Sequence, residues 1–475
     1  MNIKLLIQSS IGCICIILVC FYGIGCSHAK EETQANSDKR SKSQIILSIP
    51  DTLKPGVLYP NVLINNDQLN SFAIYLPKLY RSNTNWPTVF FFDPSGNGSL
   101  PLSKYKSLAD SLGYILIGSN VSKNGQDVEE ALVIWNALKN ICFNNLSIDR
   151  NRLILAGFSG GARVCCAIAS KEGIISGIIA NSAGAQQLEE LLNQNTFFIG
   201  LAGNCDMNRA EMLGIEQHLI STTLTHFYIE FDGTHEWAPF QTMQKALMLA
   251  SMNAYLKNPN AVDASIIENF ISNQTKEIQK LKIENKWLDA YDQLKLLNYG
   301  AKGLNTLPIE DMDSIENHES YIAQKTENLK LIAQETQMQQ ELYKLMQDNP
   351  NIILWKSKID LIRKNSIQKN KTGQMNQRIL GYASLVCYSL SNRNLVAKNY
   401  ALTEKMVNCY EIVDPQNSEV YFLKAVLSGT KADTINTNLN LKKCIKLGFN
   451  DKKRISNQLE FNFLKDDKTF KEILN

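Results

Sequence analysis

The sequence has almost no excess charge and only one long apolar run, and both scarcities exclude classes of protein. It holds 49 Lys and Arg against 46 Asp and Glu, so the formal net charge at pH 7 is only +3. Such a small bias does not indicate nucleic-acid binding. A mean hydropathy of −0.18 excludes a polytopic membrane protein. The 475 residues, 44% of them hydrophobic, suffice for two or three globular domains.

The usual sequence signals for phosphate and metal binding are also missing. No Gly-x-x-x-x-Gly-Lys-Ser/Thr phosphate loop occurs, and Gly96 and Gly98 form only a fragment of a dinucleotide fingerprint. Of the 11 Cys, four lie within the first 26 residues, and the others are scattered without metal-ligand spacing. We therefore expect no cofactor, no metal and no nucleic-acid partner, and we expect the scattered Cys to be small core residues.

The long apolar run occupies residues 5–22 at the N-terminus. A single Lys precedes it and polar sequence follows it, which is typical of an export signal. The run ends at residues 23–26 (Gly-Ile-Gly-Cys), which resemble a bacterial lipobox. We therefore expect a signal peptide in 1–25, a lipidated Cys26 that anchors the exported protein to the cell envelope, and a tether in 26–43. Simple secretion and an uncleaved membrane anchor remain open.

Between residues 44 and 258, short β-rich runs alternate with stretches of helical periodicity. Several runs are continuously apolar, as expected for parallel strands buried on both faces, and the stretches between them suit crossover helices. The expected strands are 45–49, 57–63, 72–76, 88–92, 114–118, 153–157, 177–181, 196–201 and 226–231. The expected helices are 102–112, 126–139, 161–171, 185–192, 211–221 and 241–256. An α/β domain with a mostly parallel sheet follows.

Beyond residue 258 no strong strand appears, and Lys, Asn, Gln and Leu dominate. We therefore expect an all-α helical domain in 259–475. Its expected helices are 264–278, 285–297, 322–347, 355–362, 376–390, 395–412, 418–427 and 434–447. The last four form two pairs that resemble degenerate tetratricopeptide-type repeats, with a plain helical bundle as the alternative. Such a domain could recruit a protein partner.

The candidate chemistry lies in the first domain, at the pattern Gly157-x-Ser159-x-Gly161. An apolar strand precedes this pattern, and a helix that begins with small residues follows it. This context predicts that Ser159 sits on a strained strand-to-helix turn that lifts its hydroxyl above the sheet. Side chains at the two glycines would collide with the neighbouring strand and helix. The helix start would point backbone N–H groups at the reaction centre.

A serine hydroxyl needs a base to become a nucleophile, and the base needs an orienting acid. His235 lies in a Gly-containing loop after the last expected strand, and Asp206 lies in the loop after the strand before it. Asp232 is only three residues before His235 and would need an unusual loop to orient it. The other nearby histidine, His226, begins an expected strand, which favours a structural role for it over the role of the base. We therefore predict a triad of Ser159, His235 and Asp206.

Acyl transfer also needs hydrogen-bond donors for the developing oxyanion. One is expected from the N–H of Gly160, directly after the nucleophile. The other is expected from the loop 93–98 after the third core strand, with Ser95 or Gly96 as candidates and a simple Asp-Pro turn as the alternative. Trp237 follows the candidate base by two residues, and it either walls the acyl pocket or packs the loop.

Residues 70–240 resemble an α/β-hydrolase, closest to its esterase and polyester-depolymerase-like branch. The resemblance is carried by residues 91–96 (Phe-Phe-Asp-Pro-Ser-Gly), the turn at 157–161, Asp206, and residues 233–237 (Gly-Thr-His-Glu-Trp). It implies a cofactor-free serine hydrolase that acts through an acyl-enzyme on a small-molecule or polymer ester. A serine peptidase is the alternative enzyme, and a non-catalytic binding lipoprotein with a hydrolase-fold scaffold is the alternative outside enzymes.

Overall fold

The computed structural model describes residues 53–64, 67–185, 188, 195–301, 312–347 and 350–474. The predicted signal peptide, the lipidation site Cys26, the tether and the strand 45–49 lie outside these residues, as does most of the predicted helix 185–192. The chain divides into two compact units between Leu329 and Lys330. We call them the first and the second unit.

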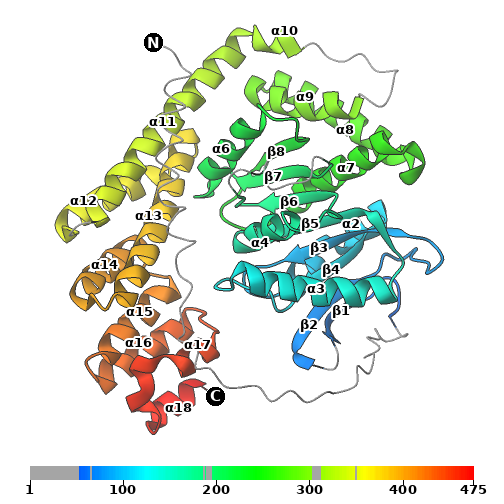
Figure 1. Ribbon diagram of the computed structural model, residues 1–475. Coiled ribbons are helices and arrows are strands. Elements are labelled where there is room, and N and C mark those ends of the chain that lie inside the picture. The colour runs from blue at the N-terminus through cyan, green and yellow to red at the C-terminus, as the bar shows by residue number, and fades with distance from the viewer. Residues whose placement is uncertain are drawn as a thin grey trace, which may run out of the picture. The chain divides into compact units, whose positions relative to one another are not determined.

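The first unit contains an eight-stranded β-sheet (Figure 1). Its strands are β1 (Leu58–Ile64), β2 (Asp67–Tyr75), β3 (Trp86–Phe92), β4 (Ile115–Ser119), β5 (Ile148–Phe158), β6 (Gly177–Asn181), β7 (Phe197–Gly203) and β8 (His226–Phe231). Their order across the sheet is β1-β2-β4-β3-β5-β6-β7-β8. Strand β2 runs antiparallel to β1 and β4, and every other pair is parallel. This arrangement is that of the α/β-hydrolase fold, so the predicted fold class is confirmed.

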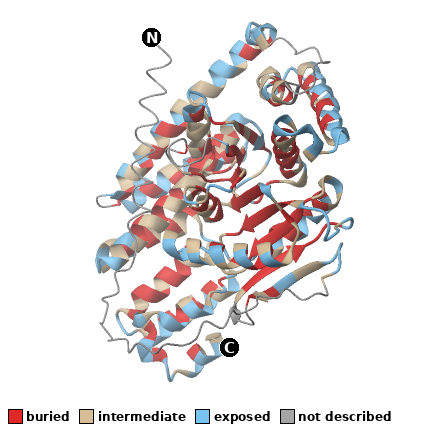
Figure 2. Cartoon of the chain, turned by 45° about the vertical axis from the view of Figure 1, so that its right-hand side comes forward, coloured by how far each residue is buried: buried red, intermediate tan, exposed pale blue. Residues whose placement is uncertain are grey.

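Helices cover both faces of the sheet, which is why its central strands are apolar on both sides (Figure 2). The covering helices are α2 (Ser99–Leu112), α3 (Val128–Asn145), α4 (Gly160–Ala169), α6 (Arg209–Leu219) and α7 (Phe240–Lys257). Side chains of β3 alternate between the two faces. Phe91 packs in the core that includes α2 and α7, whereas Phe90 and Phe92 pack in the core that includes α3, α4 and α6.

The first unit extends beyond the predicted domain boundary near residue 258. The helices α8 (Ala264–Ile283) and α9 (Trp287–Ala301) follow a 3-10 turn at Pro259–Ala261. Helix α8 packs on α7 and buries Ile267, Phe270 and Ile271 in the core that also contains β3 and α2. The change in composition at residue 258 therefore marks a change in secondary structure, and it does not mark the end of the compact unit.

We expect a fragment of residues 44–258 to be much less stable than a fragment of residues 44–329. Removing α8 exposes the apolar surface of α7 on which Ile267, Phe270 and Ile271 pack, and full burial of each such side chain contributes about 1.5–3 kcal/mol. Thermal and urea unfolding of the two fragments checks this. Equal free energies of unfolding would place the boundary where the sequence predicts it.

The second unit is helical. Helix α10 (Met312–Glu316) still belongs to the first unit, and α11 (Glu319–Gln347) begins there and continues into the second unit. The described helices that follow in the second unit are α12 (Ile352–Ser366), α13 (Lys371–Val396), α14 (Tyr400–Val413), α15 (Ser418–Gly429), α16 (Thr434–Lys446), α17 (Lys452–Asn457) and α18 (Lys468–Leu474). The division between the units falls within α11. Helix α13 packs against α14, and α15 packs against α16. The kinship of these pairs to tetratricopeptide repeats stays a prediction.

A buried ion pair ties α13 to α11 inside the second unit. The guanidinium of Arg378 donates from Nε to both carboxylate oxygens of Glu335 at 3.0 Å, and both side chains are about 5% exposed. Removing one partner of such a pair would leave a buried charge uncompensated.

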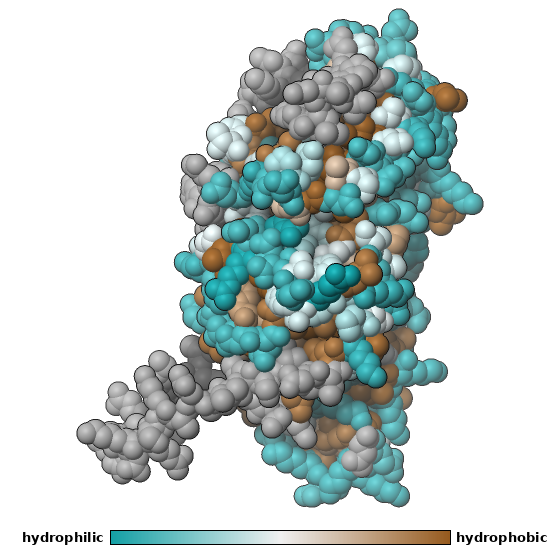
Figure 3. Space-filling view, turned by 90° about the vertical axis from the view of Figure 1, so that its right-hand side faces the viewer, coloured by the Kyte–Doolittle hydropathy of each residue, from teal (hydrophilic) through white to brown (hydrophobic). Residues whose placement is uncertain are grey.

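Polar side chains cover most of the face drawn in Figure 3, with apolar side chains scattered among them. None of the described helices combines the length and the apolarity needed to cross a membrane.

Candidate active site

Ser159 lies on the turn between β5, which ends at Phe158, and α4, which begins at Gly160. Its backbone has φ 52° and ψ −120°, a left-handed φ that is rare for a residue with a side chain. The Ser159 N–H donates to the carbonyl of Asn181 at the end of β6 (2.8 Å). The surrounding strands thus hold the serine in a strained conformation, as expected for a nucleophile on a strand-to-helix turn.

The glycines around Ser159 are required by close backbone approaches. A Cβ atom on Gly157 would lie 2.3 Å from the carbonyl of Gly161, and a Cβ atom on Gly161 would lie 1.9 Å from the carbonyl oxygen of Phe92. Both distances are far below a van der Waals contact, so larger residues cannot occupy these positions without moving β3 or α4. These are the collisions that the pattern Gly157-x-Ser159-x-Gly161 predicts.

The structure brings Ser159, His235 and Asp206 together. His235, in the loop after β8, has its Nε2 3.0 Å from Oγ of Ser159 and its Nδ1 2.9 Å from Oδ1 of Asp206. Asp206, in the loop after β7, is fully buried, and the same oxygen accepts the N–H of Asn208 at 2.8 Å. Donation from Nδ1 to the carboxylate leaves the lone pair of Nε2 facing the serine hydroxyl, so the ring can accept the hydroxyl proton.

The loop 93–98 does not offer the donors predicted from it. The Ser95 N–H donates to Oδ1 of Asp93 (2.9 Å), and the Gly96 N–H donates to the carbonyl of Asp93 (3.0 Å). The alternative interpretation, an Asp-Pro turn, therefore describes the loop. The prediction fails because the Asp93 carboxylate competes for the N–H group two residues later, as Asp side chains commonly do in turns.

Trp237 lies in the core and is only 6% exposed. Its ring contacts those of Phe91, Tyr105 and Phe158, with ring centroids 5.7–6.2 Å apart. Its Nε1 donates to Oδ2 of Asp93 at 2.8 Å. Of the two roles expected for Trp237, packing the loop is the one that the structure supports, because the side chain is enclosed on all of these sides.

A second hydrogen bond fixes the loop that carries His235. The phenol of Tyr105, on α2, donates to the carbonyl of Ala238 at 2.6 Å. Burial raises the pKa of Tyr105, with a smaller contribution from Glu236, so the phenol stays protonated and keeps donating. Together with the bond from Trp237 to Asp93, this contact holds the segment after His235 against the sheet.

Asn181 is a positioning residue that the sequence analysis missed. It is fully buried at the end of β6, and its Oδ1 accepts the N–H of Ala238 at 2.6 Å. Its Nδ2 donates to Oγ of Ser182 (2.7 Å) and to the carbonyl of Glu236 (3.2 Å). Because its own carbonyl also holds Ser159, Asn181 connects the serine turn with the histidine loop. The sequence offers only one signal, a polar residue at the end of an otherwise apolar strand.

We expect Asn181→Ala to slow ester hydrolysis about 10- to 100-fold at nearly unchanged KM, because misplacing a catalytic group by about 1 Å can cost about 100-fold. The lost hydrogen bonds should also lower the free energy of unfolding by about 1–3 kcal/mol. Steady-state kinetics well below the melting temperature checks this.

Asn253→Ala is the matched control, because Asn253 is buried in the same unit and donates to the hydroxyl of Tyr299 at 2.7 Å. It should lose stability but keep full activity. Equal losses of activity in the two variants would contradict a positioning role for Asn181.

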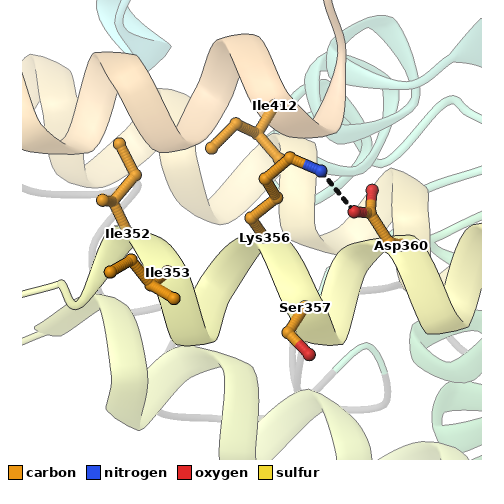
Figure 4. A pocket seen from close by; sticks show the side chains of 6 residues that line it. All are labelled: Ile352, Ile353, Lys356, Ser357, Asp360 and Ile412. Atoms are coloured by element: carbon orange, nitrogen blue, oxygen red, sulfur yellow. Dashed lines mark hydrogen bonds and ion pairs between the residues drawn. The ribbon is translucent and has the colours of Figure 1, made fainter.

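A hollow of about 600 Å³ lies in the second unit (Figure 4). Its lining residues are Ile352, Ile353, Lys356, Ser357, Asp360 and Ile412. Lys356 pairs with Asp360 at 2.5 Å, and no histidine lines the hollow to activate Ser357. Among the described residues, no group of three or more His, Cys, Asp or Glu side chains could hold a metal ion. The assembled triad therefore remains the candidate active site.

Comparison with known proteins gives likenesses in structure only. No protein-family model and no curated protein matches the chain. A fluorophosphonate-binding serine hydrolase, FphF of Staphylococcus aureus, is 13% identical with a TM-score of 0.34, over 41% of this chain and 98% of that one. The S-formylglutathione hydrolase FrmB of Staphylococcus aureus is 14% identical with a TM-score of 0.31, over 41% and 94%.

A mutant feruloyl esterase module of Clostridium thermocellum, solved with sinapinate, is 13% identical with a TM-score of 0.32, over 44% of this chain and 93% of that one. The strand order of the sheet, and not these distant likenesses, assigns the first unit to the α/β-hydrolase fold.

Proposed function

We propose that the protein is a serine hydrolase that cleaves carboxylic esters through an acyl-enzyme. One observation carries the proposal: the imidazole of His235 lies within hydrogen-bond distance of both the Ser159 hydroxyl and the buried Asp206 carboxylate. A strained serine turn and a buried carboxylate both cost stability. A protein that had lost the activity would therefore not be expected to retain all three groups in this geometry.

In the proposed reaction, Oγ of Ser159 attacks the ester carbonyl carbon while Nε2 of His235 takes the hydroxyl proton. The carbonyl oxygen becomes an oxyanion next to the N–H of Gly160, at the start of α4, where the first N–H groups have no acceptor within the helix. When the tetrahedral intermediate collapses, the alcohol leaves with the proton from His235. Water then repeats the same steps to release the acid and restore the serine.

The Asp206 carboxylate acts on the histidine and not on the substrate. Its charge stabilises the imidazolium that forms in each step, and its hydrogen bond keeps the proton of the neutral ring on Nδ1. Its complete burial strengthens both effects, because no water screens the carboxylate from the ring.

The lipobox-like residues 23–26 lead us to propose further that the chain is exported and anchored to the cell envelope through Cys26. An anchored chain should fractionate with membranes and be released by detergent. Recovery of the whole chain in the aqueous fraction would contradict the anchor.

A substrate panel on the purified chain tests the proposed activity. We expect short-chain and aryl esters to turn over and peptide amides to turn over more slowly, because an amide needs its poor leaving group to be protonated. Faster turnover of peptides would make the protein a peptidase. A folded chain that hydrolyses neither class would favour the scaffold alternative, in which the helical second unit recruits a protein partner.

A further inference from the structure

The two backbone donors that the sequence predicts from the loop 93–98, those of Ser95 and Gly96, are already engaged within the fold. The Gly160 N–H is available for an oxyanion, and the usual source of a second donor is the loop 93–98. In this loop Pro94 has no N–H, and the N–H groups of Ser95 and Gly96 are used by Asp93. The N–H of Gly98 donates to the Asn120 side chain at 3.0 Å.

A carboxamide from the loop after β4 lies beside the serine turn instead. The loop 120–127 is tied to the loop 93–98 by an antiparallel bridge between Ser95 and Lys123 and by a hydrogen bond from the Asn124 N–H to the Pro94 carbonyl (2.8 Å). These contacts place Asn124 against Gly160. A Cβ atom on Gly160 would lie 1.8 Å from Oδ1 and 3.6 Å from Nδ2 of Asn124.

The environment of Asn124 suits a group that meets a substrate. Asn124 is exposed to solvent, whereas Asn181, which positions the histidine loop, is buried. A carboxamide carries two N–H donors and one acceptor, and a half-turn about its terminal bond exchanges the oxygen and the nitrogen. Nδ2 can therefore take the place that Oδ1 has next to Gly160, the residue directly after Ser159.

We propose that Asn124 is a catalytic residue whose Nδ2 donates the second hydrogen bond to the oxyanion, beside the N–H of Gly160. This inference rests on the proposed function, since it assigns a donor to the reaction that Ser159 starts. The loop after β4 would thereby replace the loop after β3 as the source of this donor. A side chain at position 160 would displace this carboxamide.

The variants Asn124→Ala and Asn124→Asp test this proposal on the full chain, with Lys123→Ala as the matched control on the exposed neighbour in the same loop. We expect kcat for a p-nitrophenyl ester to fall about 100- to 1,000-fold in both Asn124 variants, with KM changed by less than about threefold. Affinity for a trifluoromethyl ketone, which forms an oxyanion on the serine, should fall in proportion. Lys123→Ala should retain the kinetics and ketone affinity of the wild type.

The outcomes separate this inference from the proposed function. An active wild type whose Asn124→Ala variant keeps its kcat would overturn the inference alone. A loss of kcat without a matching loss of ketone affinity, or a loss that follows a fall in melting temperature, would also overturn it, because it would mark a structural role. A folded wild type with no ester turnover would overturn the proposed function and this inference with it.

Discussion

Replacing Ser159 by alanine is expected to reduce the turnover of an ester substrate by about 10⁶-fold, the scale on which removing a serine nucleophile acts in other hydrolases. The loss follows because the substrate carbon then has no oxygen to attack it, and His235 has no hydroxyl to deprotonate. The fold should be unaffected, since the side chain adds only one hydrogen bond, to His235. Kinetics with a sensitive fluorogenic ester, together with thermal unfolding, checks both parts.

The control for this variant is Ser170→Ala at the other end of α4. There the hydroxyl donates only to the carbonyl of Ala167 at 2.8 Å, so we expect unchanged activity and a change in unfolding free energy of less than about 1 kcal/mol. If the activity of Ser159→Ala stayed within tenfold of the wild type, Ser159 would not be the nucleophile.

Replacing Asp206 by asparagine is expected to lower kcat by about 10⁴-fold. An asparagine can turn its Nδ2 toward Nδ1 of the ring, which moves the ring proton to Nε2. The ring then donates to Ser159 and cannot accept the hydroxyl proton. The variant also lacks the negative charge of the carboxylate, which stabilises the imidazolium. Measuring kcat and KM separately checks this, because KM should change little.

Asp232→Asn is the matched control, since Asp232 is the other carboxylate near the base in sequence. It is exposed and accepts a hydrogen bond from Asn204 at 2.9 Å. We expect activity within twofold of the wild type. If Asp232→Asn lost as much activity as Asp206→Asn, the acid would not be uniquely assigned to Asp206.

The sequence predicted the parts of this molecule that depend on local pattern. The strands β6 and β8 begin and end at the predicted residues, 177–181 and 226–231. The positions of Asp206 and His235 were predictable because both follow parallel strands, whose carboxyl ends meet at one edge of a sheet. The glycines of the serine turn were predictable because the turn itself forbids side chains.

The parts that the sequence did not predict depend on which contacts the side chains and helices make in the folded chain. Whether Ser95 offers its N–H to a substrate is decided by the Asp93 carboxylate two residues before it. The burial of Trp237 is decided by Asp93 and Tyr105, more than 130 positions away in sequence. Asn181 and Asn124 belong to no motif, so only their contacts reveal them. The extent of the first unit likewise depends on how α8 packs on α7.

Labelling by a fluorophosphonate probe shows whether Ser159 is an activated nucleophile. Attack by Oγ of a reactive serine on phosphorus expels fluoride and leaves a stable phosphonyl ester, whereas an ordinary serine hydroxyl does not react. We expect stoichiometric labelling of the peptide that contains Ser159, found by mass spectrometry, with labelling lost in Ser159→Ala and in His235→Ala. No label on a folded wild-type chain, or a label on a different serine, would contradict it.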